Sequence, residues 1–163
     1  MSLHYLLDGY NIIKQVPALA ALSLEDGRNS LAQWINVHRP QGSVNNAVTI
    51  VFDGRSDIFG GSSAVGLKVI FTSDESADDK IKAIVEAGGK TNYVVVSNDK
   101  GIVLYARSLG AKILSVAEFM AAGAPKGHRK TKNGKDLPAG KHISLAQTDA
   151  INKEFSKLWL NKP

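Results

Sequence analysis

Cysteine is absent from the 163-residue sequence, which excludes disulfide bonds and thiolate metal ligands. Long apolar runs are also absent, since no stretch approaches the ~18 residues that a membrane-spanning helix needs. No basic leader followed by an apolar segment opens the chain. Histidine is scarce, and its four occurrences show no ligand-like spacing. We therefore expect a soluble cytoplasmic protein without membrane contact.

The positive charge is concentrated at one end of the chain. Residues 125–163 hold nine Lys/Arg against three Asp/Glu, whereas residues 1–124 hold eleven against twelve. This asymmetry suggests a polyanionic partner, most simply nucleic acid, although a solvated tail would look the same. The candidate nucleic-acid-binding residues are Lys126, Arg129, Lys130, Lys132, Lys135 and Lys141.

Short apolar runs rich in β-branched residues predict five strands. They show little polar alternation, which is typical of strands buried on both faces of a parallel sheet. The runs are LHYLLD (3–8), AVTIVFD (47–53), LKVIFT (67–72), NYVVVSND (92–99) and AKILS (111–115).

Helical patterns alternate with these strands. Capping boxes at Ser23 and Ser76 open two helices, a third follows Asp99, and a fourth covers 116–122. The alternation predicts an α/β fold with an open parallel sheet and helices on both faces. We expect one domain over 1–124, followed over 125–163 by a basic loop and an amphipathic helix (148–160) that packs on the body.

Aspartates end three of the predicted strands, at Asp8, Asp53 and Asp99, and the acidic segment 74–79 follows a fourth. Because parallel strands end at one edge of a sheet, the fold would gather these acids. Taken singly, each could be a turn or cap residue. Taken together, carboxylates without nearby cations repel one another, and a bound hard cation, Mg²⁺ or Mn²⁺, would relieve that repulsion.

The two adjacent acids of the segment 74–79 differ in their helical direction. At ~100° per residue, Asp78 lies about 60° from the apolar face centred on Ile81, and Asp79 about 160°. Asp78 is therefore the better ligand candidate, and Asp79 is expected to act in the capping box. Carboxylates, a hard cation and a basic segment together suit metal-dependent phosphodiester hydrolysis, which needs no Ser-His nucleophile.

Four motifs in this order resemble the NYN domains of the YacP type, a branch of the PIN-like nuclease superfamily: LLDGYNII, VFDG, FTSDESADDKI and VVVSNDKGI. The resemblance spans about residues 3–122. It implies a five-stranded parallel sheet of order 3-2-1-4-5, a divalent-metal site and endonucleolytic cleavage of RNA.

Carried over residue by residue, the resemblance assigns catalytic and metal-binding roles to Asp8, Asp78 and Asp99. Asn11 matches the asparagine of the D-G-x-N turn, which helps to shape the site. Asp53 and Asp79 are accessory candidates. Asp74 departs from the expected pattern, so the register within the acidic segment is open by a residue or two.

Other functions remain open at this point. The chain could be a non-catalytic module that holds RNA or a ribonucleoprotein on the same fold. A phosphotransferase of the haloacid dehalogenase type would need a D-x-D start, but position 10 is Tyr. A receiver domain would need two adjacent acids in the first strand–helix loop, which the sequence DGYN lacks. Chemistry alone leaves both RNA and DNA open, and the oligomeric state and any ribosome contact are not indicated.

Overall fold

A five-stranded parallel sheet forms the centre of the protein, seen here in a computed structural model that describes residues 2–54, 66–89, 92–124 and 152–153. The strands are β1 (His4–Asp8), β2 (Ala47–Asp53), β3 (Leu67–Thr72), β4 (Tyr93–Val96) and β5 (Lys112–Leu114). Their order in the sheet is β3-β2-β1-β4-β5, and every neighbouring pair is parallel. The predicted fold class and strand order are confirmed.

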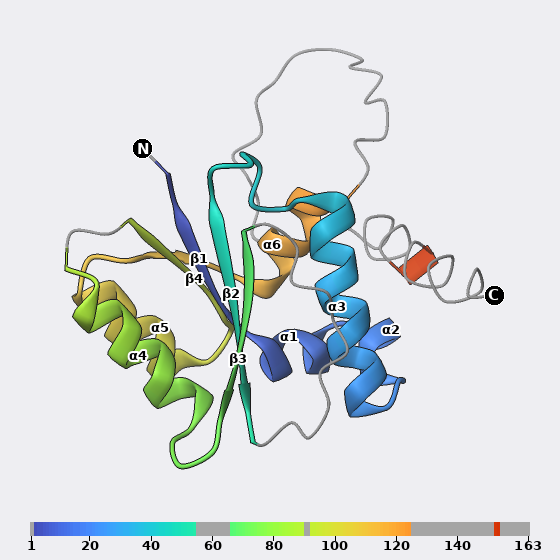
Figure 1. The fold of residues 1–163 in the computed structure, drawn as a ribbon, viewed down its shortest axis with the longest axis horizontal. Coiled ribbons are helices and arrows are strands. Elements are labelled where there is room, and N and C mark those ends of the chain that lie inside the picture. Colours follow the sequence, from blue (N-terminus) through green and yellow to red (C-terminus); the bar gives the residue numbers. More distant parts are fainter. Residues whose placement is uncertain (1, 55–65, 90–91, 125–151, 154–163) are drawn as a thin grey trace.

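Helices cover both faces of the sheet (Figure 1). One face carries α1 (Gly9–Gln15), α2 (Pro17–Ala20), α3 (Leu24–His38) and α6 (Val116–Gly123). The other carries α4 (Ala77–Ala87) and α5 (Lys100–Ser108). Burying both faces explains why β2 and β4 consist of nearly continuous apolar residues.

The first helix is a departure from the sequence prediction. The segment Asp8-Gly9-Tyr10-Asn11 was expected to be a turn, but α1 begins at Gly9, directly after β1. Gly9 is required there because a Cβ at this position would lie 2.2 Å from the ring of Phe52. The helix therefore approaches β2 more closely than any larger residue would permit.

The order of the strands reverses between β1 and β4, since β2 and β3 extend the sheet on one side and β5 on the other. In open α/β sheets this switch point, at the carboxyl ends of the strands, is where ligands bind. The ends of β1 and β4 are therefore the part of the fold that positions a site.

Several predictions on the remaining segments lie outside the described residues. These are the basic loop, the packing of the C-terminal helix, of which only 152–153 are described, and most of the connection 54–66. No helix in the described part of the chain is long and apolar enough to cross a membrane.

Candidate metal and nucleic-acid site

Asp8 is the last residue of β1 and also the N-cap of α1. Its Oδ1 accepts a long hydrogen bond, 3.5 Å, from the backbone N–H of Asn11. Alternation along β1 places Asp8 on the same face as Leu6, which packs in the core beneath α4 and α5. The carboxylate is thus half-buried at the switch point, on the side of the sheet that α4 and α5 cover.

The sequence pattern placed Asp99 at the end of a strand, and this prediction is wrong. β4 ends at Val96, and Asp99 is the N-cap of α5, with its Oδ1 accepting from the N–H of Ile102 at 3.1 Å. The intervening turn is held by Ser97, whose Oγ accepts from the N–H of Asp99 at 3.0 Å. Ser97 is buried, so this turn fixes where the α5 N-terminus begins.

Two asparagines connect the loops at this edge. Asn11 Oδ1 accepts from the backbone N–H of Asn98 at 2.9 Å, which links α1 to the loop after β4. Asn98 Oδ1 in turn accepts from the N–H of Val116 at the start of α6, at 3.1 Å. Asn11 therefore lies inside a helix, and its side chain positions the segment that carries Asp99.

The two adjacent acids at the start of α4 have different surroundings. Asp79 is exposed and takes part in the N-terminal cap of α4, because its N–H donates to Ser76 Oγ at 3.0 Å and its carboxylate accepts from that hydroxyl at 2.9 Å. The reciprocal bond of a capping box, from the backbone N–H of Ser76 to the carboxylate, is not formed. Asp78 is half-buried, and its Oδ2 accepts from Lys82 Nζ at 2.9 Å. Its Oδ1 is buried and has no hydrogen-bond partner.

The charges of Asp99 and Asp78 act on the carboxyl group of Asp8. The pKa of Asp8 is raised above its ordinary value of 3.8, chiefly by burial, although the N–H of Asn11 opposes the shift. The negative charges of Asp99 and then Asp78 raise the pKa of Asp8 further. Residues distant in sequence are thus close enough at this edge to oppose the ionisation of Asp8.

A divalent cation suits this donor set. Within the described part of the chain, no three acidic or histidine side chains are grouped as in a preformed metal cage. Mg²⁺, however, keeps several water ligands and is commonly bound through only one or two carboxylates. The orphaned Oδ1 of Asp78 and the raised pKa of Asp8 are features that a cation would relieve, so Asp8, Asp78 and Asp99 fit such an ion.

Asp53 lies apart from these three residues. Asp8 is paired with Val51 in the sheet, so β2 continues two residues further and ends at the exposed Asp53. Asp53 is not among the charges that shift the pKa of Asp8. The six predicted nucleic-acid-binding residues between Lys126 and Lys141 lie outside the described residues.

Two cations near the strand ends were missed by the sequence analysis. Lys82 pairs with Asp78 one helical turn away, and this hydrogen bond raises the pKa of Lys82. Arg28 donates from Nη1 to the hydroxyl of Tyr10 at 2.9 Å. The position of Arg28 could have been noticed in the sequence, because helical spacing puts this cation on the same face as the apolar residues Leu31, Ala32 and Ile35, which are buried.

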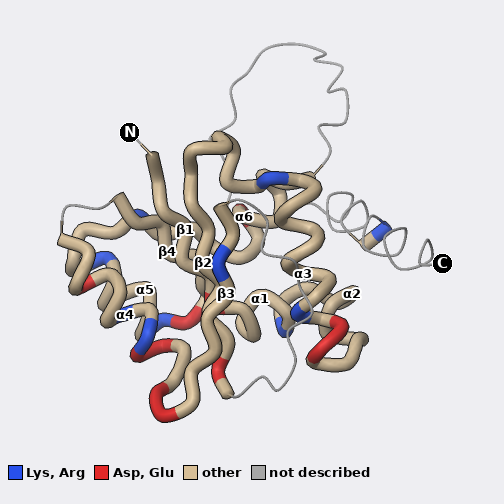
Figure 2. Tube along the Cα trace, viewed as in Figure 1, with Lys and Arg blue, Asp and Glu red and all other residues tan. Residues whose placement is uncertain are grey.

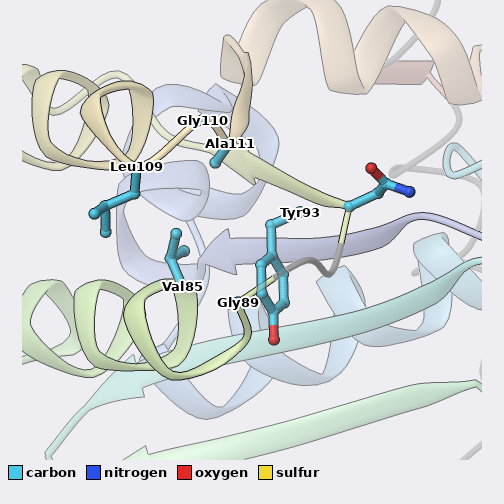
Figure 3. A pocket seen from close by; sticks show the side chains of 7 residues that line it. Val85, Gly89, Tyr93, Leu109, Gly110 and Ala111 are labelled. Atoms are coloured by element: carbon cyan, nitrogen blue, oxygen red, sulfur yellow. The ribbon is translucent and has the colours of Figure 1, made fainter.

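The charges of the described chain are distributed unevenly (Figure 2). Acidic segments gather where β1, β2 and β3 end, around the starts of α4 and α5. A small hollow of about 160 Å³ lies elsewhere, lined by the end of α4, the start of β4 and the end of α5 (Figure 3). This hollow lies at the amino end of β4, away from the carboxyl ends of the strands, and no acidic residue lines it. It is therefore not part of this site.

Comparison with known proteins identifies the family of the chain. The sequence model of the YacP-like NYN domain matches residues 5–158. The chain belongs to the YacP-like NYN domain family. NYN and PIN-like domains are generally nucleases that use divalent metals, and NYN domains are generally ribonucleases.

Two solved structures with this NYN fold are crystal structures of Rae1 (YacP) from Bacillus subtilis. A tryptophan-to-leucine variant is 29% identical to this chain, with a TM-score of 0.61, and the match covers 76% of this chain and 75% of that one. The other structure is 23% identical, with a TM-score of 0.58, covers 98% of this chain and 80% of that one, and indicates the shared fold alone. No curated protein sequence matches the chain.

Proposed function

We propose that this NYN protein is a divalent-metal-dependent endoribonuclease that hydrolyses RNA phosphodiester bonds at the edge formed by Asp8, Asp78 and Asp99. The observation that carries the proposal is the buried, unpartnered Oδ1 of Asp78, together with the rise in the pKa of Asp8 that burial and the charges of Asp99 and Asp78 cause. The three carboxylates would hold Mg²⁺ or Mn²⁺. Such an ion activates water and neutralises charge on the phosphate.

The protein's own residues contribute orientation. The caps of α1 and α5 fix Asp8 and Asp99, because each carboxylate accepts a hydrogen bond from its own helix. Lys82 donates a hydrogen bond to Oδ2 of Asp78, which leaves Oδ1 available to a cation. Asn11 holds the loop of Asp99 against α1. These contacts would set the positions of the three carboxylates, and the proposed hydrolysis needs no Ser-His pair.

The second candidate function is a non-catalytic RNA-binding module, which the basic segment 125–163 favours. Incubation of labelled single-stranded and structured RNA with the full chain, with Mn²⁺ or with EDTA, separates the two. We expect internal cleavage that requires the metal. Binding without cleavage under both conditions would favour the binding module, and undiminished cleavage in EDTA would contradict the metal mechanism.

Matched variants make this experiment specific. Asp8→Asn and Asp99→Asn preserve the cap acceptors and remove the charge, so cleavage should fall by about 10²-fold or more while folding survives. Glu86→Gln is the control, because Glu86 is exposed near the far end of α4. Asp53→Asn should have a smaller effect than Asp8→Asn, since Asp53 does not influence the ionisation of Asp8.

A further inference from the structure

Arg28 occupies an unusual position for a cation. It lies in the second turn of α3, on the face that packs toward the sheet, and it is half-buried. Its guanidinium Cζ is 5.4 Å from the centroid of the Phe71 ring, and Nη1 donates to Tyr10 Oη at 2.9 Å. The group is therefore held on two sides, by an aromatic face and by a hydroxyl.

This guanidinium has no anionic partner among the described residues. The ion pairs there are Lys80–Glu75 and Lys82–Asp78, and neither involves Arg28. Its Nε is buried and makes no hydrogen bond. A partly buried charge that lacks a counter-ion costs stability, as does a buried donor without an acceptor. The arrangement has the features of a site whose anion is supplied from outside.

The position of Arg28 relates it to the aspartates. Tyr10 lies in the first turn of α1, two residues after Asp8, and its ring packs against Phe52 with 5.1 Å between centroids. Phe52 stacks in turn on Phe71, at 5.5 Å and 23°. The aromatic residues thus connect Arg28 to the residues that immediately follow Asp8.

The aspartates at the starts of α4 and α5 lie on one side of the sheet edge, and Arg28 lies on the other. Asp78 and Asp99 begin α4 and α5 on one face, whereas Arg28 belongs to α3 on the other, and Asp8 lies at the end of the central strand between them. A strand of RNA that crosses this edge, with one phosphate at the aspartates, would carry a further phosphate toward α3.

We propose that Arg28 binds a non-bridging oxygen pair of an RNA phosphate other than the scissile one, with Tyr10 and Phe71 holding the guanidinium in place. This inference rests on the proposed function for its substrate class. Arginine suits the role because its planar fork donates two parallel hydrogen bonds to a phosphate, and because it stacks on aromatic rings. Arg28 is a binding residue in this proposal and takes no part in bond breaking.

The test measures RNA binding separately from cleavage. In the full-length Asp8→Asn background, fluorescence anisotropy with labelled single-stranded RNA is recorded over a range of salt concentrations. Arg28→Gln should weaken binding at low salt by roughly tenfold, and should flatten the log–log salt slope by about 0.7, the value for one phosphate contact. Arg39→Gln is the control, since Arg39 is exposed at the other end of the same helix.

Two further variants keep the test decisive. Arg28→Lys retains the charge but loses the fork, so it should keep the slope and bind several-fold more weakly. Tyr10→Phe should weaken binding less than Arg28→Gln does. If Arg28→Gln does not fold, as judged by its melting curve, Arg28→Lys decides the question: affinity equal to that of the parent overturns the inference.

The outcomes also separate this inference from the proposed nuclease function. A changed slope in Arg28→Gln with no cleavage by the wild type would leave the phosphate contact standing and remove the nuclease activity. Cleavage by the wild type with equal slopes for Arg28→Gln and the parent would overturn the phosphate contact alone. Equal losses in Arg28→Gln and Arg39→Gln, or no binding of RNA by the parent, would overturn it as well.

Discussion

The backbone N–H of Asn98 donates a 2.9 Å hydrogen bond to Oδ1 of Asn11, although 87 positions separate the two residues. This contact connects the helix that follows β1 to the loop that follows β4, across the point where the strand order reverses. It gives Asn11 a positioning role toward Asp99, which is the next residue after Asn98.

Asn11→Ala should lower both stability and cleavage. Loss of the side-chain acceptor should reduce the free energy of unfolding by about 1 kcal/mol. Cleavage should fall because the loop of Asp99 is no longer held, and the loss should appear in kcat more than in KM for RNA. Asn45→Ala is the control, because Asn45 is exposed in the loop before β2. A kcat equal to that of the wild type would contradict the positioning role.

Asp78→Asn should cost much more activity than Asp79→Asn. Asp78 carries the buried unpartnered oxygen, whereas Asp79 is engaged in the N-terminal cap with Ser76. Asp79→Asn should mainly weaken that cap, by up to about 1 kcal/mol. Asp26→Asn provides the matched stability control, since Asp26 makes the same two hydrogen bonds with Ser23 at the start of α3. Equal losses of cleavage in Asp78→Asn and Asp79→Asn would mean that both carboxylates act in the site.

Asp8→Asn should stabilise the metal-free protein at neutral pH. Because the pKa of Asp8 is raised on folding, the folded state binds a proton more readily than the unfolded state, and the ionised carboxylate is unfavourable in the fold. The gain should therefore be present at pH 7 and should shrink as the pH falls through the raised pKa toward 3.8. Asparagine preserves the N-cap. Melting temperatures in EDTA between pH 4 and 8 provide the measurement, with Glu86→Gln as the control.

Addition of Mn²⁺ should make the wild type more stable than Asp8→Asn. A ligand at 100 times its Kd stabilises the protein that binds it by about 2.7 kcal/mol, and Asp8→Asn should bind the ion much more weakly. If the melting temperatures of the wild type and the variant rise equally with Mn²⁺, Asp8 does not ligate the ion.

The basic segment should contribute to nucleic-acid affinity. If about three of the six Lys and Arg residues between Lys126 and Lys141 contact phosphates, changing all six to Gln should flatten the log–log salt slope by roughly 2. Turnover at saturating RNA should change little, because the proposed metal site is elsewhere. Parallel slopes for the wild type and this variant would show that the segment only adds solubility.

Much of the fold could be predicted from the sequence because both faces of the sheet are buried. Continuous apolar runs located all five strands, and the N-cap residues Ser23 and Ser76 located the starts of α3 and α4, although neither forms the full capping box that was expected. The helix α1 was not predicted, since it is seven residues long and begins with a poor helix former, Gly9. Its packing against β2, which local sequence does not report, stabilises it.

The candidate site was predicted less completely. At the start of α4, the helical directions of Asp78 and Asp79 predicted different surroundings, and Asp78 is half-buried while Asp79 is exposed. The position of Asp99 was wrong by three residues, because Ser97 and Asn98 form a turn after β4 that apolar patterning cannot reveal. The pairing of Lys82 with Asp78 was missed, although its i, i+4 spacing on a helix can be read from the sequence.

The close approach of Gly9 to Phe52 has an evolutionary consequence. Phe52 contacts both Tyr10 and Phe71, so any side chain at position 9 would displace a ring on which the surroundings of Asp8 and Arg28 both depend. Enlargement of residue 9 would require a smaller residue at position 52 in the same lineage. Among relatives that share this fold, the two positions should therefore covary, and a large residue at both should not occur.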